Sequence, residues 1–282
     1  MPIGRPVIKR RTLLTALATA PVLSTVSAAA PAMPAAAADE QASNTALYAN
    51  PVWTEGVDWG RRSRRHLVDD QSVTGRAPVI RTTVIAPHGG GIEGGTSELC
   101  LAIAGYAPSD LAPTPDGGPV HDFWMFEGLM RTGNTDLHVT STHCDDTIAR
   151  SLCAGSLNVL SLHGCSPEQA GLEAGAAAVL VGGLNATFRQ YLTEEFTAAG
   201  IRAVTASDEE EIAGVSPDNI CNRTLLGMGV QLEITTALRA SMFATGKNTV
   251  ADRATNLLPS FWTFVAGARK AIDRVEAGQT VL

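Results

Sequence analysis

A histidine and a glutamate lie five positions apart in the segment from Val84 to Gly105, where a glycine-rich run follows an apolar stretch. His88 offers an imidazole nitrogen and Glu93 a carboxylate oxygen. These are two of the three protein ligands that a catalytic zinc ion takes when its fourth position stays open for water. The glycines within residues 89–95 permit the backbone to fold back so that both side chains reach one ion. The same run is also typical of a phosphate-binding or purely structural turn, in which His88 would have no chemical role.

A third ligand would come from the remaining histidines, which are His66, His121, His138, His143 and His163. We favour His163, because it ends the apolar run 158–162 and precedes a glycine, as His88 ends an apolar run of its own. In open α/β sheets, ligand sites gather at the carboxyl ends of strands, so two such histidines can face one crevice. His143 is the competitor for the ligand role, and otherwise we expect it to support a ligand or contact the substrate.

Hydrolysis at such a centre also needs a carboxylate that takes a proton from water without binding the metal. The alternation in residues 230–234 places Glu233 on the face opposite the apolar side chains of an expected strand. A buried glutamate is costly without a positive partner, and a metal centre is such a partner. Asn222 and Arg223 lie in the loop before this strand, and arginine can hold a substrate carboxylate through two hydrogen bonds. The plain alternative is a surface loop with a surface arginine.

The elements that must position these residues have the pattern of an α/β layer structure. From residue 79 onward, apolar runs of strand length alternate with helical patterns, which indicates an open mixed sheet flanked by helices. The expected strands cover residues 79–86, 123–126, 137–141, 158–162, 177–181, 203–205 and 229–234. The expected helices cover residues 96–104, 186–199 and a closing segment from Phe261 to Ile272. We expect Glu98 to stabilise the first turn of the helix 96–104 rather than bind metal.

Residues 1–38 have the pattern of an export signal that is removed on secretion. Arg10 and Arg11 precede an apolar run and then small residues suited to cleavage, which favours the twin-arginine route. Because proline and polar residues interrupt the run, we expect cleavage and release rather than a membrane anchor. The sequence therefore predicts a leader over 1–38, an N-terminal extension over 39–77 and a catalytic domain over 78–282.

The formal charge of the whole chain is −7 at pH 7, and the leader carries four basic residues and no acidic one. The mature protein is therefore more acidic than the precursor, which argues against non-specific binding of nucleic acid. The five cysteines leave at least one thiol unpaired within a monomer, and their spacing does not determine any pairing.

The ordered motifs resemble the poly-γ-glutamate hydrolase family of phages and bacteria. They are HGGGIEGGTSELCLAIAG, STHCDD, SLHG followed by VLVGG, PDNICNR and GVQLEI, and they extend from Val84 to the helix after Ile234. The resemblance implies a zinc-carboxypeptidase-like open α/β fold with one zinc ion held by two histidines and a glutamate. On this sequence it implies the ligands His88, Glu93 and His163, the catalytic carboxylate Glu233, and the substrate-side residues Asn222 and Arg223.

Together these observations predict a secreted zinc-dependent enzyme that hydrolyses γ-glutamyl amide bonds of poly-γ-glutamate or a related acidic peptide. Glu233 would act as the general base on zinc-bound water. The alternatives are a peptidoglycan amidase or peptidase with the same zinc chemistry, and a non-catalytic protein that binds the cell wall. A serine esterase is disfavoured because the sequence contains no GxSxG nucleophile turn. The expected partner is an acidic glutamate polymer or peptide. After cleavage of the leader, we expect no stable insertion of the mature protein into a membrane. The sequence does not determine the number of subunits.

Overall fold

The computed structural model describes Met1 and residues 41–66, 81–114, 118–207 and 212–279. Apart from Met1, all of these residues belong to one of the two units into which the chain divides, Met33–Leu282. Apart from Met1, the expected leader, 1–38, lies outside the described residues, as do residues 67–80 around the expected domain boundary. Within the described ranges, none of the helices has the length and apolar character needed to cross a membrane.

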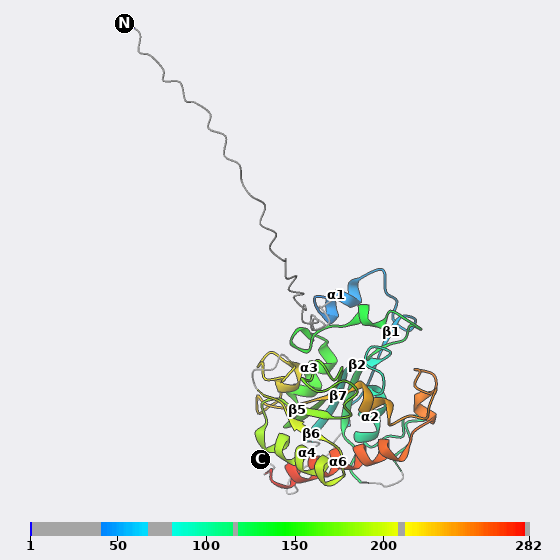
Figure 1. Cartoon of the computed structure of the whole chain (residues 1–282), viewed down its shortest axis with the longest axis vertical. Helices are drawn as coiled ribbons and strands as arrows, with labels where there is room; N and C mark the ends of the chain where they lie inside the picture. The colour runs from blue at the N-terminus through cyan, green and yellow to red at the C-terminus, as the bar shows by residue number, and fades with distance from the viewer. Residues whose placement is uncertain (2–40, 67–80, 115–117, 208–211, 280–282) are drawn as a thin grey trace, which may run out of the picture. The chain divides into compact units, whose positions relative to one another are not determined.

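A mixed sheet of seven strands forms the centre of this unit, in the order β1-β3-β2-β4-β7-β5-β6 (Figure 1). The strands are β1 Trp59–Arg64, β2 Thr82–Gly90, β3 Asp122–Gly128, β4 Asn158–Cys165, β5 Val179–Gly182, β6 Ala203–Thr205 and β7 Val230–Thr235. The central strands β3, β2, β4 and β7 run parallel to one another, whereas β1 and β5 run antiparallel to β3 and β7. The expected open mixed α/β sheet is confirmed.

Helices cover both faces of the sheet. The helices are α1 Asn44–Ala49, α2 Thr96–Ile103, α3 Thr147–Ala154, α4 Ala186–Ala198, α5 Thr236–Ala240 and α6 Pro259–Ala277, with short 3₁₀ turns η1 Asn134–Leu137, η2 Ser141–His143, η3 Ile220–Asn222 and η4 Arg253–Thr255. Buried side chains of α2, α4 and α6 join one core cluster, and those of α1 and α3 join a second. Successive residues of β2 contribute to different clusters, since Val84 belongs to the first and Ile85 to the second.

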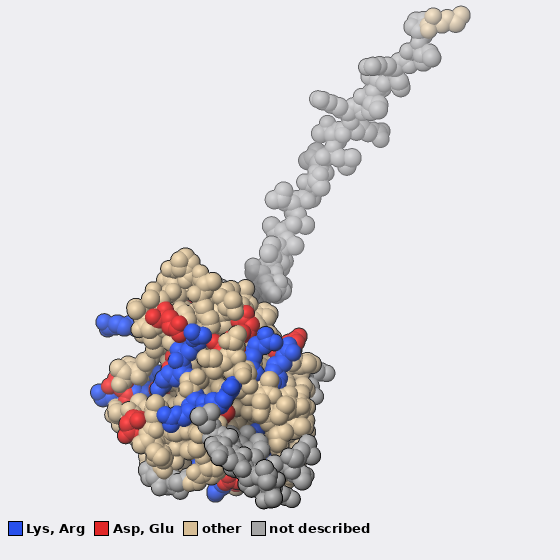
Figure 2. Space-filling view, turned by 180° about the vertical axis from the view of Figure 1, so that it is seen from behind, with Lys and Arg blue, Asp and Glu red and all other residues tan. Residues whose placement is uncertain are grey.

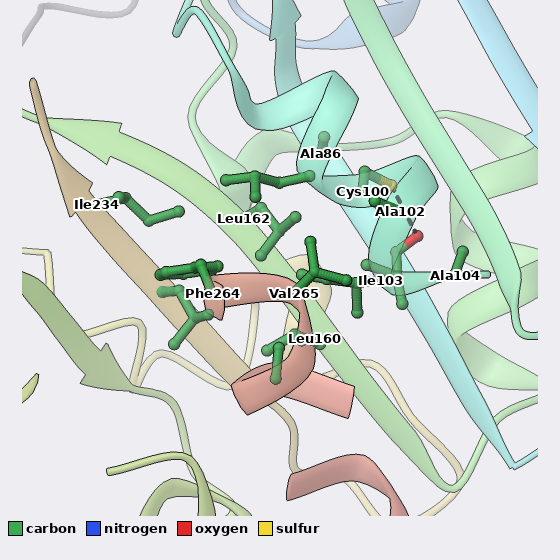
Figure 3. Close-up of a cluster of buried hydrophobic side chains, with 14 of the residues drawn as sticks. Ala86, Cys100, Ala102, Ile103, Ala104, Leu160, Leu162, Ile234, Phe264 and Val265 are labelled. Atoms are coloured by element: carbon green, nitrogen blue, oxygen red, sulfur yellow. Dashed lines mark hydrogen bonds between the residues drawn. The ribbon is translucent and has the colours of Figure 1, made fainter. Parts of the chain in front are cut away.

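Figure 3 shows the larger core, in which Phe264 and Val265 of α6 lie close to Leu160 and Leu162 of β4. Phe264 is fully buried and stacks on Phe196 of α4 with ring centroids 4.5 Å apart. This contact joins the two helices over the strand that carries His163.

Replacement of Phe264 by alanine is expected to lower the free energy of unfolding by about 3–5 kcal/mol, because it removes a buried ring and leaves a cavity. Urea unfolding followed by circular dichroism measures the change. The exposed Lys270 of the same helix serves as the control, and its alanine variant should stay within about 0.5 kcal/mol of the wild type. Equal stability of the two variants would contradict the packing described above.

Residues from the expected N-terminal extension contribute the edge strand β1 and helix α1. Trp59 is buried and stacks on Tyr48 of α1 with ring centroids 4.5 Å apart. Arg62 holds Glu127 of β3 through two hydrogen bonds of 2.6 and 2.8 Å. These contacts fix residues 41–66 on the sheet.

Charged side chains of both signs are mixed on the face drawn in Figure 2, where basic residues form a band with acidic residues among them. That face therefore presents no continuous surface of one sign.

One expected strand does not form. A strand is expected from the sequence over residues 137–141. In the structure Leu137 ends η1 and Ser141 begins η2, so the segment between them lies outside the sheet. The carbonyl of Val139 is instead 2.8 Å from Nε2 of His88, which places this segment beside the ends of the central strands.

Candidate metal centre and active-site cavity

Three neighbouring parallel strands each carry an ionisable residue near their carboxyl ends. β2 carries His88, β4 carries His163 and β7 carries Glu233, and these strands are adjacent in the sheet. The register pairs His163 directly with Glu233, so both side chains project from the same face. The structure therefore brings His88, His163 and Glu233 together at the carboxyl ends of their strands, as expected from the sequence.

The glycine-rich turn after β2 returns Glu93 to His88. The amide N–H of Glu93 donates to the carbonyl of His88 at 2.9 Å, and Oε1 of Glu93 lies 2.9 Å from Nδ1 of His88. Gly90 has a φ of 63°, which favours glycine. A side chain at Gly91 would collide with Asn134. The glycines are thus needed for the turn that joins the two side chains.

Two further histidines approach this pair. Nδ1 of His163 lies 3.1 Å from Nδ1 of His88 and 3.8 Å from Oε2 of Glu93. His138, which follows η1, has its Nε2 atom 4.0 Å from Oε1 of Glu93. Its ring centroid is 3.9 Å from that of His88, and the ligand-type atoms of His88, Glu93 and His138 lie within 4.8 Å of one another. Ligand atoms held tetrahedrally about 2.0–2.2 Å from zinc lie roughly 3.3 Å apart. The two His163 distances lie on either side of this spacing, whereas the distance from His138 to Glu93 exceeds it.

The hydrogen bonds around His88 fit a metal ligand. A carbonyl oxygen can only accept, so the 2.8 Å contact with Val139 places the proton of a neutral His88 on Nε2. Nδ1 then presents a lone pair toward the carboxylate of Glu93, which is also an acceptor. At 2.9 Å these two atoms are joined either by a second proton on the ring, which makes His88 an imidazolium, or by a metal cation that takes the place of that proton. A second ring nitrogen that donates to a backbone carbonyl is a recurring feature of metal-binding histidines.

The other ring nitrogen of His163 is held by hydroxyl groups. Nε2 lies 2.9 Å from Oγ of Ser161 and 3.2 Å from Oγ of Ser141. Burial and the neighbouring His88 lower the pKa of His163 to about 3. The ring is therefore neutral at neutral pH, and the neutral form is the one that binds metals.

The two glutamates of the site have opposite environments. Burial raises the pKa of Glu93, but the neighbouring histidines, His88 foremost, outweigh it and lower that pKa to about 2. Burial and the charge of Glu93 raise the pKa of Glu233 well above its usual value. The site thus contains one carboxylate suited to bind a cation and another suited to hold a proton.

Gln231 orients Glu233. Its Nε2 donates to Oε1 of Glu233 at 2.8 Å, and its Oε1 accepts from Nδ2 of Asn219 at 2.8 Å. Gln231 and Glu233 lie on the same face of β7, while Leu232 between them joins the hydrophobic core. The sequence analysis did not assign Gln231 a role, although the period of two that selected Glu233 also places Gln231 beside it.

A cavity of about 410 Å³ lies over these residues. Its polar wall includes His88, Glu93, Thr135, His138, Thr140, Ser141, Thr142, His163, Gln169, Ser216, Asn219, Gln231 and Glu233. Among the described residues, no lysine or arginine lines it. The candidate metal ligands and a second carboxylate therefore line one cavity together with many hydroxyl and amide groups.

The three residues expected on the substrate side do not line this cavity. The Asn222 side chain donates to the carbonyls of Gly214 and Ser216 at 2.8 Å and accepts from the amide of Gly229 at 3.0 Å, so it is used in holding loops together. These loops meet before the start of β7, whereas Glu233 lies toward its end. Arg223 is exposed and paired with Asp218, and His143 is exposed at the end of η2. A substrate contact by these residues stays a prediction.

The sequence of this chain matches a family model and several known proteins. A family model described as poly-gamma-glutamate hydrolase matches residues 66–266. The protein YndL of Bacillus subtilis is 36% identical over 167 residues, which cover 59% of this chain and 57% of YndL. The prophage-derived protein YoqZ of the same organism is 34% identical over 193 residues, which cover 68% of this chain and 62% of YoqZ. The matches thus span less than two thirds of either relative.

Two solved structures resemble most of this chain. A bacteriophage poly-gamma-glutamate hydrolase superposes with a TM-score of 0.69 at 29% identity, covering 86% of this chain and 100% of the phage protein. The zinc-free apo form of YndL superposes with a TM-score of 0.65 at 28% identity, covering 84% of this chain and 98% of that one.

Proposed function

The chain belongs to the poly-γ-glutamate hydrolase family, and we propose that it hydrolyses γ-glutamyl amide bonds in poly-γ-glutamate or a related acidic peptide. The observation that carries this proposal is the convergence of His88, Glu93 and His163 with a second carboxylate, Glu233, in one cavity. We further propose one zinc ion per chain at the first three residues. The existence of YndL in a form distinguished as zinc-free supports zinc as the metal.

When bound, zinc supplies a Lewis acid that polarises the scissile carbonyl and lowers the pKa of a water molecule to about 7. Glu233 takes the proton from the attacking water and delivers it to the leaving amine. Its raised pKa suits a group that must hold the proton between these two transfers. Gln231 keeps the carboxylate in place through the 2.8 Å hydrogen bond.

His163 and His138 have different roles in this proposal. His163 is buried, neutral and held from behind by two serines, as a ligand should be. His138 lies on the segment outside the sheet and lines the cavity beside His88. We assign His138 to contact with the bound substrate.

Alanine variants separate these roles. His163→Ala is expected to lose most of its zinc, because removing one of three protein ligands opens the site. His138→Ala should keep about one zinc per chain and lose activity mainly through KM. Metal analysis of the dialysed proteins by mass spectrometry provides the measurement. Zinc loss in His138→Ala with retention in His163→Ala would reverse the assignment.

The substrate is tested by incubating the protein with poly-γ-glutamate and, separately, with purified peptidoglycan. We expect the polymer to shorten, with new amino termini appearing at the rate of chain cleavage. Release of wall peptides with an intact polymer would instead favour a peptidoglycan amidase or peptidase. No turnover of either substrate by zinc-loaded protein would favour a protein that only binds.

A further inference from the structure

A second cavity borders the glycine-rich turn that carries Glu93. Its volume is about 760 Å³, and Gly91 and Gly94 line it. Ile92 and Glu93, which lie between those glycines in the chain, line the cavity of the candidate metal centre instead. The turn is therefore a wall shared by the two cavities.

The charges of the two cavities are opposite. The second cavity is lined by Arg131, Arg239 and Arg253, and by no acidic residue within the described ranges. The first cavity is lined by two glutamates and, in the same part of the chain, by no lysine or arginine. The shared turn therefore has a candidate metal centre on one side and a group of guanidinium ions on the other.

The three arginines differ in how far their charges are already used. Arg253 is buried and paired with Glu98 at 3.1 Å. Arg239 donates to the carbonyls of Ile234 and Gly94 at 3.0 and 2.9 Å, which hold its guanidinium in place without neutralising it. Arg131 is exposed and forms no ion pair with another described residue. The charge of Arg131 is thus available to an external anion, and that of Arg239, which also interacts with Glu93 and Glu233, is available in part.

If the chain hydrolyses poly-γ-glutamate as proposed above, its substrate matches this arrangement. Each γ-linked unit keeps a free α-carboxylate, so the polymer carries one negative charge per residue. A polymer chain whose scissile amide lies at the metal centre extends beyond that cavity, and the second cavity lies on the other side of the turn that carries Glu93. Arginine binds a carboxylate in a planar two-bond arrangement that a lysine cannot reproduce.

We propose that the second cavity is a subsite for α-carboxylates of the poly-γ-glutamate chain away from the scissile bond, with Arg131 and Arg239 as its cationic groups. The subsite orients the polymer while the cavity at His88 and Glu93 holds the reacting amide. Because Arg239 also supports the backbone at Gly94, the test is placed on exposed positions of the cavity wall.

Binding of a short oligomer of γ-linked glutamate is measured by calorimetry at low ionic strength with Glu233→Gln protein, so that hydrolysis does not consume the ligand. A second substitution in this protein, Arg131→Gln, should raise the dissociation constant about three- to fivefold, the size expected for loss of one partly exposed ion pair. Arg150→Gln is the matched control, because Arg150 is exposed on α3 and lines neither cavity. It should leave the constant unchanged.

Two variants of opposite charge at Val250 give a test that leaves the native arginines in place. Val250 lines the second cavity and is 38% exposed, so we expect the fold to accept lysine or glutamate at this position. Val250→Lys should strengthen oligomer binding and Val250→Glu should weaken it. The difference between the two should shrink as salt is added, because screening weakens exposed charge interactions.

The outcomes separate this subsite from the proposed function. If wild-type protein cleaves poly-γ-glutamate but oligomer binding is the same in the Arg131 and Val250 variants, the subsite is overturned and the hydrolase stands. If the oligomer binds with the expected charge dependence but wild type cleaves nothing, the subsite stands and the hydrolase does not. Absence of measurable oligomer binding would overturn the subsite as well.

Discussion

Glu233→Gln is expected to lower kcat on poly-γ-glutamate by about a hundredfold or more, the usual contribution of a positioned general base. Glutamine has the shape of glutamate and its carbonyl can still accept from Gln231, but it cannot take a proton from water. Glu233 is 6% exposed and lies on the strand next to His163. The loss should therefore appear in the chemical step, with zinc content near that of the wild type.

The matched control for this substitution is Glu194→Gln on α4. Glu194 is an exposed carboxylate that pairs with Arg274 and lines neither cavity described above. The same chemical change at this position should leave kcat unaltered. Full activity of Glu233→Gln, measured beside this control, would place the base elsewhere.

Removal of the metal should lower the rate of hydrolysis even more than Glu233→Gln does. A Lewis acid that polarises the carbonyl contributes several kcal/mol, so chelation is expected to lower the rate by about a thousandfold. Zinc added back should restore the activity of the wild type, because the three proposed ligands come from neighbouring elements that the fold holds in place. Glu93→Ala should not recover, since it lacks the carboxylate that joins the turn to His88. Recovery of Glu93→Ala with added zinc would remove Glu93 from the proposed ligand set.

Much of the site could be predicted because its signals are local. His88 and His163 each end an apolar run, and the carboxyl ends of adjacent parallel strands meet in space. Glu233 was selected by an alternation of period two, which depends only on the pleat of one strand. The return of Glu93 to His88 follows from the glycines between them.

The remaining features depend on contacts between distant segments, which no local pattern contains. Val139 lies in a run that alternates like a strand, yet its carbonyl is paired with the ring of His88 rather than with a neighbouring strand. That contact also brings His138 to the metal centre. Asn222 was expected on the substrate side because of its motif, but its amide bonds backbone groups of two other loops. Arg131 belongs to no motif, and only the fold places it beside Arg239 and Arg253.

The most direct measurement of the central claim is the size distribution of poly-γ-glutamate after incubation with protein whose zinc content is determined in the same sample. The account predicts that the polymer shortens with zinc-loaded protein, stays intact after chelation, and shortens again when zinc is restored to about one ion per chain. Equal shortening by the loaded and the metal-free protein would contradict it, as would an intact polymer with fully loaded protein.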